Sequence, residues 1–74
     1  MKREIAEAAV IACIELISST VSEADAMAKA ARHCAEAGQG ERAFQIALDL
    51  EPLLDDANSL LQAAAVIRRR IAPP

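Results

Sequence analysis

The apolar residues between Ala43 and Ile71 keep a single seven-residue phase over that whole stretch. They follow one another at alternating steps of three and four residues: Ala43, Ile46, Leu50, Leu53, Ala57, Leu60, Ala64, Ile67 and Ile71. Because about half of the chain is apolar, nine such positions would be filled by chance, in any of seven registers, in roughly one sequence in 40. Ala47, Leu54 and Leu61 widen the stripe to about three positions in seven. The pattern therefore predicts a helical segment with one buried face.

The rest of the chain favours helices as well. No run of strand length alternates between apolar and polar residues, and glycine and proline are confined to junctions between apolar segments. The sequence therefore predicts an all-α protein, and its 74 residues allow one helical domain, residues 1–74. Phe44 is the only aromatic residue and many apolar residues are alanine, so the core is expected to be thin. Domains of this kind usually gain stability from a disulfide, a metal or a partner subunit.

Two helices are expected before residue 40. The first should run from about Lys2 to Ser18, where a cluster of hydroxyl side chains competes for backbone hydrogen bonds and favours a turn. That cluster consists of Ser18, Ser19 and Thr20. The second helix should begin at residues 21 to 23, where two pairs have capping-box spacing. These pairs are Thr20 with Glu23 and Ser22 with Asp25. Gly38 should end this helix in the left-handed conformation.

Pro52 lies inside the seven-residue phase of the last segment. A proline in a helix interior removes one hydrogen bond and costs about 3 kcal/mol. Either a third helix stops near Leu50 and a fourth begins at Pro52, or one helix continues with a kink. We favour the interruption at residues 50 to 52, because Asp55 and Asp56 would then lie in an N-terminal turn. The expected fold is a small three-helix bundle with the third helix interrupted or kinked at Pro52, giving three to four helices.

The sequence contains no set of residues suited to catalysis or to a metal or cofactor. His33 is next to Cys34 and three residues before Glu36, but a closed zinc site needs four ligands. A cysteine nucleophile would need His33 as its base, and adjacent helical residues point about 100° apart. Cys13 and Cys34 would lie about 9 Å apart along the axis of a hairpin of the first two helices, which disfavours a disulfide. We expect no enzyme, no cofactor and reduced thiols.

A membrane-spanning segment is not expected either. The longest strongly apolar run, Ile5 to Ile17, is interrupted by Glu7 and Glu15, and no signal peptide is visible. The expected location is the cytoplasm.

The only basic run is Arg68, Arg69 and Arg70, which Lys2 and Arg3 would approach if the first and last helices packed antiparallel. Cations at a helix C-terminus interact favourably with the helix dipole. The net charge of −3 and the pI near 5.0 oppose general affinity for nucleic acid. A small regulatory protein that contacts nucleic acid through Arg68 to Arg70 is nevertheless the alternative function. Acidic residues cluster near the middle of the same segment, a polarity compatible with pairing of antiparallel copies: Asp49, Glu51, Asp55 and Asp56.

Ile11 interrupts the polar face of the first helix. Four polar residues fall within about 40° of one line, with Ile11 at the centre: Glu4, Glu7, Glu15 and Ser18. Single exposed apolar residues are common and need no explanation. Alternatively, a second subunit covers Ile11, which would also compensate for the thin core. The expected function is a protein-protein interaction module, either a homodimer or a binder of another protein. Its candidate interface residues are Ile11, Glu4, Glu7, Glu15, Arg68, Arg69 and Arg70.

Overall fold

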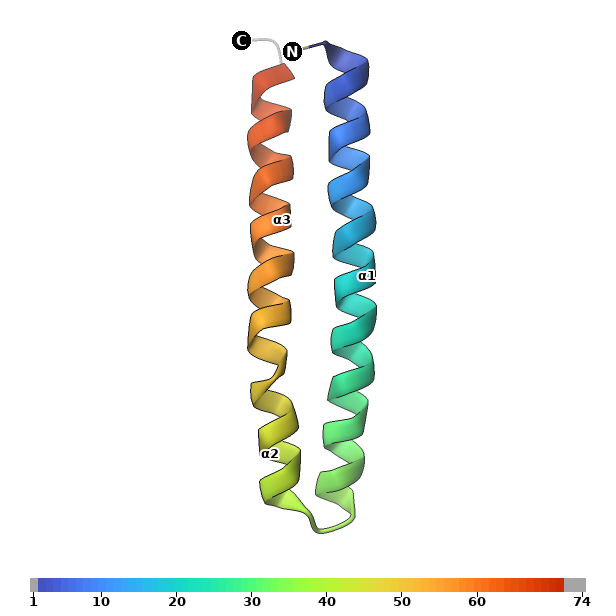
Figure 1. Cartoon of the computed structure of the whole chain (residues 1–74), viewed down its shortest axis with the longest axis vertical. Coiled ribbons are helices and arrows are strands. Elements are labelled where there is room, and N and C mark those ends of the chain that lie inside the picture. The colour runs from blue at the N-terminus through green and yellow to red at the C-terminus, as the bar shows by residue number, and fades with distance from the viewer. Residues whose placement is uncertain (1, 72–74) are drawn as a thin grey trace.

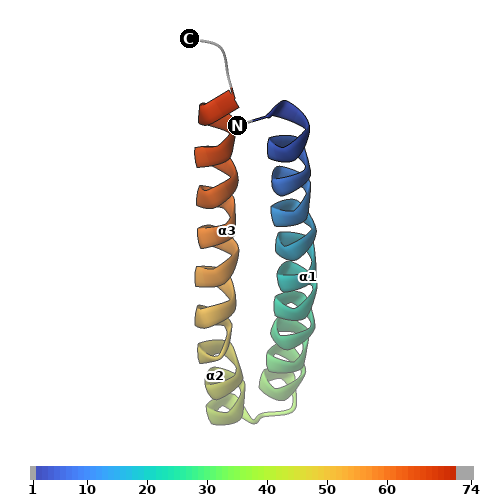
Figure 2. The ribbon, with the colours of Figure 1, turned by 45° about the horizontal axis from the view of Figure 1, so that its top comes forward.

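Two antiparallel helical arms form a hairpin with dimensions of 55 × 16 × 14 Å (Figure 1). The structure, a computed structural model, describes residues 2–71. The first arm is α1, Arg3–Glu36, and the second arm consists of α2, Gly40–Leu48, followed by α3, Leu50–Ile71. The arms lie side by side over their whole length in both views (Figures 1 and 2). The all-α prediction is confirmed, whereas the predicted three-helix bundle is wrong, because only two arms pack together.

Helix α1 continues through Ser18, Ser19 and Thr20, where the sequence analysis expected a break. Serine and threonine cost a helix only a few tenths of a kcal/mol each, and neither glycine nor proline occurs at this point. Ile17 before the cluster and Ala24 after it both face the second arm, as does Thr20 itself. Packing along the whole arm therefore outweighs the local preference for a turn, and the two capping-box pairs do not mark a helix start.

The seven-residue phase forms the inner face of the second arm. All nine of its residues are buried or half-buried, and every other described residue of α2 and α3 is exposed. Helix α1 presents a matching row of buried and half-buried residues: Ala6, Val10, Cys13, Ile17, Thr20, Ala24, Met27, Ala31 and Cys34. Ala9 is half-buried beside this row. Two such rows, facing each other from antiparallel helices, make the seam of a coiled coil. The predicted buried face is thus confirmed.

Small side chains fill much of this seam. Among the described residues no large side chain is fully buried. Only four of these residues are buried, and all four are alanines: Ala6, Ala24, Ala43 and Ala64. Val10 and Ala64 line the same surface hollow, one from each arm. The arms approach closely but bury little apolar area.

A three-residue turn, Ala37 to Gln39, joins the arms. The Gly38 N–H donates to the Ala35 carbonyl at 3.1 Å, and the Gln39 N–H donates to the Cys34 carbonyl at 2.8 Å. This is the hydrogen-bond pair of a Schellman motif, which requires a left-handed residue between the two elements. Gly38 supplies it with a φ of +81°, as the sequence predicts.

The interruption in the second arm lies at Asp49, one residue before the expected range of 50 to 52. Helix α2 ends at Leu48, and the Asp49 N–H donates to the Ile46 carbonyl at 3.1 Å, a bond one residue shorter than in an α-helix. A proline ring clashes with the carbonyl four residues earlier, which for Pro52 is that of Leu48. Pro52 itself is the third residue of α3, where its missing N–H is tolerated. The two helices stay in line (Figure 2).

Cys13 and Cys34 lie on one helix, since α1 is continuous. Their separation of 21 residues corresponds to about 31 Å at 1.5 Å per residue. The 9 Å estimate, which assumed a hairpin between residues 2 and 37, is therefore wrong. Both are free, half-buried cysteines, too far apart for a disulfide within one chain.

Candidate interaction surface

The seam leaves two long flanks on the hairpin, one on each side of the plane that contains both arms. At 100° per residue, Ile14 and Val21 lie on one side of the α1 seam, and Leu54 and Leu61 lie on one side of the α3 seam. Because the arms run in opposite directions, these two sides form the same flank. Glu7 on α1 and Leu61 on α3 accordingly line one hollow.

Six large apolar side chains lie along this flank, and we call them the apolar flank: Ile11, Ile14, Val21, Phe44, Leu54 and Leu61. Each of them exposes between 51% and 59% of its surface. The four other exposed large apolar residues of the described chain are scattered on the opposite flank or the outer face: Ile5, Leu16, Leu48 and Val66. The opposite flank also carries Asp56, which lines a smaller hollow with Leu16. The two flanks therefore differ in how much large apolar surface they present.

The apolar flank is hollowed near the end where the chain begins and α3 finishes, which we call the open end. The hollow has a volume of about 740 Å³, with Val10, Ile11, Leu61 and alanines for its walls. Glu7, Arg68 and Arg69 stand at its rim. Glu7 also accepts a hydrogen bond from Arg3 Nε at 3.1 Å. Its walls are apolar and its rim is charged, as in the core and rim of a protein interface.

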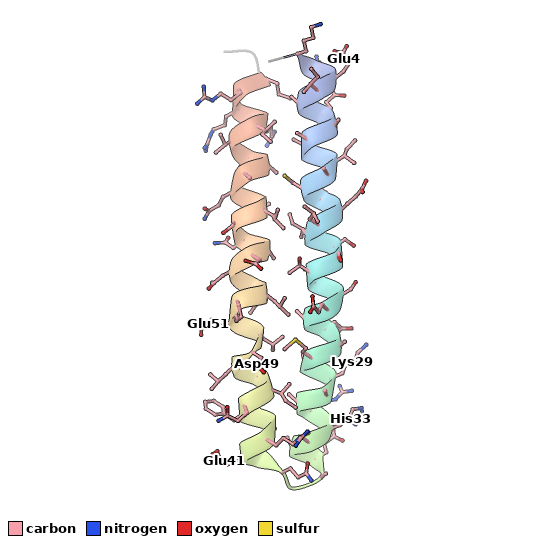
Figure 3. All side chains as sticks on the ribbon, viewed as in Figure 1. Glu4, Lys29, His33, Glu41, Asp49 and Glu51 are labelled. Carbon is pink, nitrogen blue, oxygen red and sulfur yellow. The ribbon has the colours of Figure 1, made fainter. Side chains whose placement is uncertain are left out.

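The structure brings together some of the predicted interface residues and separates others. Ile11, Glu7, Arg68 and Arg69 line the hollow, and Glu4 lies at the open end (Figure 3). Two predicted residues lie elsewhere by their helical angle: Glu15 is on the outer face of α1, and Arg70 is on the opposite flank.

Five of the six apolar-flank residues were not among the predicted interface residues: Ile14, Val21, Phe44, Leu54 and Leu61. A signal for four of them is present in the sequence. Ile14 and Val21 are seven residues apart, as are Leu54 and Leu61, so each pair forms a second row beside the seam row. Phe44 has no such signal.

Charged side chains contribute nothing to the pairing of the two arms in the described part of the chain. The ion pairs there join residues four apart within α1: Arg3 with Glu7, Asp25 with Lys29, and Arg32 with Glu36. The Lys29–Asp25 pair is the shortest, at 2.8 Å, and this hydrogen bond, together with the charge of Asp25, raises the pKa of Lys29 above 10.5. All three pairs are exposed, so water and salt screen them and each contributes little to the stability of the helix.

Charge is distributed unevenly along the hairpin. The open end, residues 2–7 and 68–70, carries five basic and two acidic side chains, a net charge of +3. The remainder, residues 8–67, carries three basic and nine acidic side chains, a net charge of −6. Glu41, Asp49 and Glu51 of the acidic part are seen on the second arm (Figure 3). The hairpin is therefore positive at its open end, and its negative charge lies along the middle of the arms, where residues 8–27 and 49–67 hold seven acidic and no basic side chains.

Helix α1 is long and apolar enough to cross a membrane, judged by its length and composition. The core helices of soluble proteins and N-terminal signal sequences meet the same criterion. The cytoplasmic location therefore stays a prediction from the sequence.

Within residues 2–71 no three His, Cys, Asp or Glu side chains are grouped so that they could hold a metal ion. Comparison with models of known protein families, with curated proteins and with solved structures gave no match.

Proposed function

We propose that the hairpin is a small protein-protein interaction module whose apolar flank is covered by a second copy of the chain. Two hairpins packed by this flank would form a four-helix homodimer. The supporting observation is the row of six large apolar side chains on one flank, each more than half exposed. Contiguous exposed apolar surface of this kind marks interaction sites in soluble proteins.

The accessible surface of the single hairpin supports this proposal. It amounts to 5665 Å², whereas a compact monomer of 7.8 kDa exposes about 4400 Å². The excess of roughly 1300 Å² is what an elongated, two-layered shape leaves uncovered. One flank of 55 by 16 Å offers roughly 900 Å², close to the roughly 800 Å² that each partner contributes to a stable interface.

The thin seam provides the energetic reason for association. Alanine side chains bury little area, so the seam supplies little of the hydrophobic free energy that a 74-residue chain needs. Covering the exposed half of a leucine or isoleucine contributes about 1 kcal/mol. A second copy would cover six such side chains on each chain, and the seam would become part of a larger core.

The test compares two leucine substitutions by analytical ultracentrifugation at micromolar concentration. Leu61→Asp places a charge on the apolar flank, and Leu48→Asp places the same charge on the outer face of the same arm. Both leucines are exposed, at 59% and 47%. We expect a dimer for the wild type and for Leu48→Asp, and a dimer dissociation constant at least about tenfold higher, in favour of monomer, for Leu61→Asp and for Ile11→Asp.

Circular dichroism of each variant checks that it remains helical. A wild type that sediments as a monomer, or a Leu61→Asp variant as dimeric as Leu48→Asp, contradicts the proposal. Flotation with lipid vesicles and retention on a heparin column are measured on the same proteins. Binding of a monomeric wild type to vesicles would assign the flank to a membrane, and heparin retention that Arg68→Gln abolishes would favour the nucleic-acid alternative.

A further inference from the structure

We infer that the hollow at the open end binds an amphipathic anion with one alkyl chain and a carboxylate head, the chemistry of a free fatty acid. The walls of the hollow belong to a single chain, so this inference goes beyond the proposed dimer and does not depend on it. A second copy seated on the apolar flank would roof the hollow and turn it into a cavity between helices, where helical bundles commonly bind ligands.

The hollow has the size and the lining of a site for an alkyl chain. Its volume of about 740 Å³ falls in the range of ligand-binding clefts, roughly 300–1000 Å³. Four branched side chains and two alanines form its walls: Val10, Ile11, Leu61, Ile71, Ala64 and Ala65. The alanines have no atoms beyond Cβ that could fill the hollow. An alkyl chain would fill it, and each CH₂ group that becomes fully buried strengthens binding about fourfold.

The charges at the rim favour an anionic head on this ligand. Arg68 and Arg69 stand at the rim, and neither forms an ion pair with another residue of the described chain. Glu7 is the acidic side chain at the rim, and it already accepts a hydrogen bond from Arg3 at 3.1 Å. The rim therefore offers guanidinium groups that can donate hydrogen bonds to a carboxylate.

The wider distribution of charge favours the same kind of ligand. The net charge of +3 on residues 2–7 and 68–70 attracts anions to the open end and repels cations that carry the same alkyl chain. The smaller hollow, about 340 Å³ on the opposite flank, has Asp56 and no arginine among its lining residues. Of these two hollows, the one at the open end combines apolar walls with arginines at its rim.

Isothermal titration calorimetry with three soluble amphiphiles, each below the concentration at which it forms micelles, tests the site. Dodecanoate should bind with a dissociation constant of about 100 µM or lower. Decanoate should bind at least about fourfold more weakly, because it buries fewer CH₂ groups. Dodecyltrimethylammonium has an alkyl chain of similar length but a positive head, and it should bind at least about tenfold more weakly than dodecanoate.

Two matched sets of variants locate the site. Ala65→Glu places a carboxylate in the wall of the hollow, and Ala63→Glu places it on the opposite flank of α3, at an alanine that is likewise exposed. Ala65→Glu should weaken dodecanoate binding at least about tenfold, and Ala63→Glu by less than about twofold. The double variant Arg68→Gln, Arg69→Gln should weaken it about three- to tenfold. Arg70→Gln, on the opposite flank, should weaken it by less than about twofold at physiological salt.

Sedimentation of the same samples separates this inference from the proposed function. A wild-type dimer that does not bind dodecanoate, or that binds dodecyltrimethylammonium equally well, overturns the site and leaves the dimer standing. A monomer that binds dodecanoate with the expected variant effects supports the site and overturns the dimer. A monomer that does not bind dodecanoate overturns both. Equal effects of Ala65→Glu and Ala63→Glu also overturn the site.

Flotation with vesicles of phosphatidylglycerol examines the other source of the same chemistry, a lipid within a bilayer. We expect dodecanoate to bind without any need for a bilayer, because the walls and the rim of the hollow lie within one chain. Binding to the vesicles without binding to free dodecanoate would overturn the site and assign the open end to a membrane surface.

Discussion

Gly38 lies in the turn and Gly40, two residues later, is the first residue of α2, and only Gly38 has a positive φ, +81°. A Cβ atom at either position would meet no atom within 4 Å. The two positions therefore differ in backbone conformation and not in available space.

This difference predicts opposite effects of the same substitution. Gly38→Ala should lower the free energy of unfolding by about 1 kcal/mol, because alanine is strained in the left-handed region. Gly40→Ala should raise it by about 0.5–1 kcal/mol, because Gly40 is the first residue of α2 and alanine is the better helix former. Urea unfolding at matched protein concentration measures both. Equal effects of the two substitutions would show that the turn is not held by a left-handed residue.

The continuity of α1 predicts slow amide exchange at residues 21 to 23. In an uninterrupted helix their N–H groups donate to carbonyls one turn earlier, within Ile17 to Ser19. In a helix that began at residue 21, these same N–H groups would have no helical partner and would exchange rapidly. Hydrogen–deuterium exchange followed by NMR should show protection at residues 21 to 23 similar to that at Ala24 to Met27. Rapid exchange confined to residues 21 to 23 would show that the helix is interrupted there.

The pair of Asp25 and Lys29 predicts a change in titration. The hydrogen bond from Lys29 and the negative charge of Asp25 raise the pKa of Lys29. The small stabilisation that accompanies a raised pKa is present below pH 10.5, and it is lost as the pH rises through the pKa of the folded state. Asp25→Asn should lower the pKa of Lys29 towards its ordinary value, as measured by NMR titration of its side chain. Glu36→Gln, which removes the neighbouring pair with Arg32, should leave it unchanged.

The sequence is sufficient to identify the inner face of the second arm, residue by residue. Nine residues in one seven-residue phase provide nine consistent signals, and all nine lie against α1. The number of helices could not be predicted in the same way, because hydroxyl residues at positions 18 to 20 resemble a turn locally. Whether they form one depends on Ile17 and Ala24 packing against an arm more than twenty residues away.

The candidate surface was only partly predictable for a related reason. Ile11 stands out because its neighbours on the helix face are polar, so one residue suffices to reveal it. Leu54 and Leu61 extend an apolar stripe, and a stripe of that width fits a helix packed against two neighbours. Their exposure follows from the fact that only one neighbour, α1, is present in the hairpin.

The short turn also determines the order in which contacts between the two arms form during folding. Seam residues next to the turn, such as Ala31 and Ala43, are about 12 residues apart in the chain, whereas seam residues at the open end, such as Ala6 and Ile67, are about 60 residues apart. The difference in loop-closure entropy is about 1.4 kcal/mol in favour of the contacts near the turn. Folding should therefore nucleate at the turn and propagate towards the open end, and unfolding should begin with fraying there.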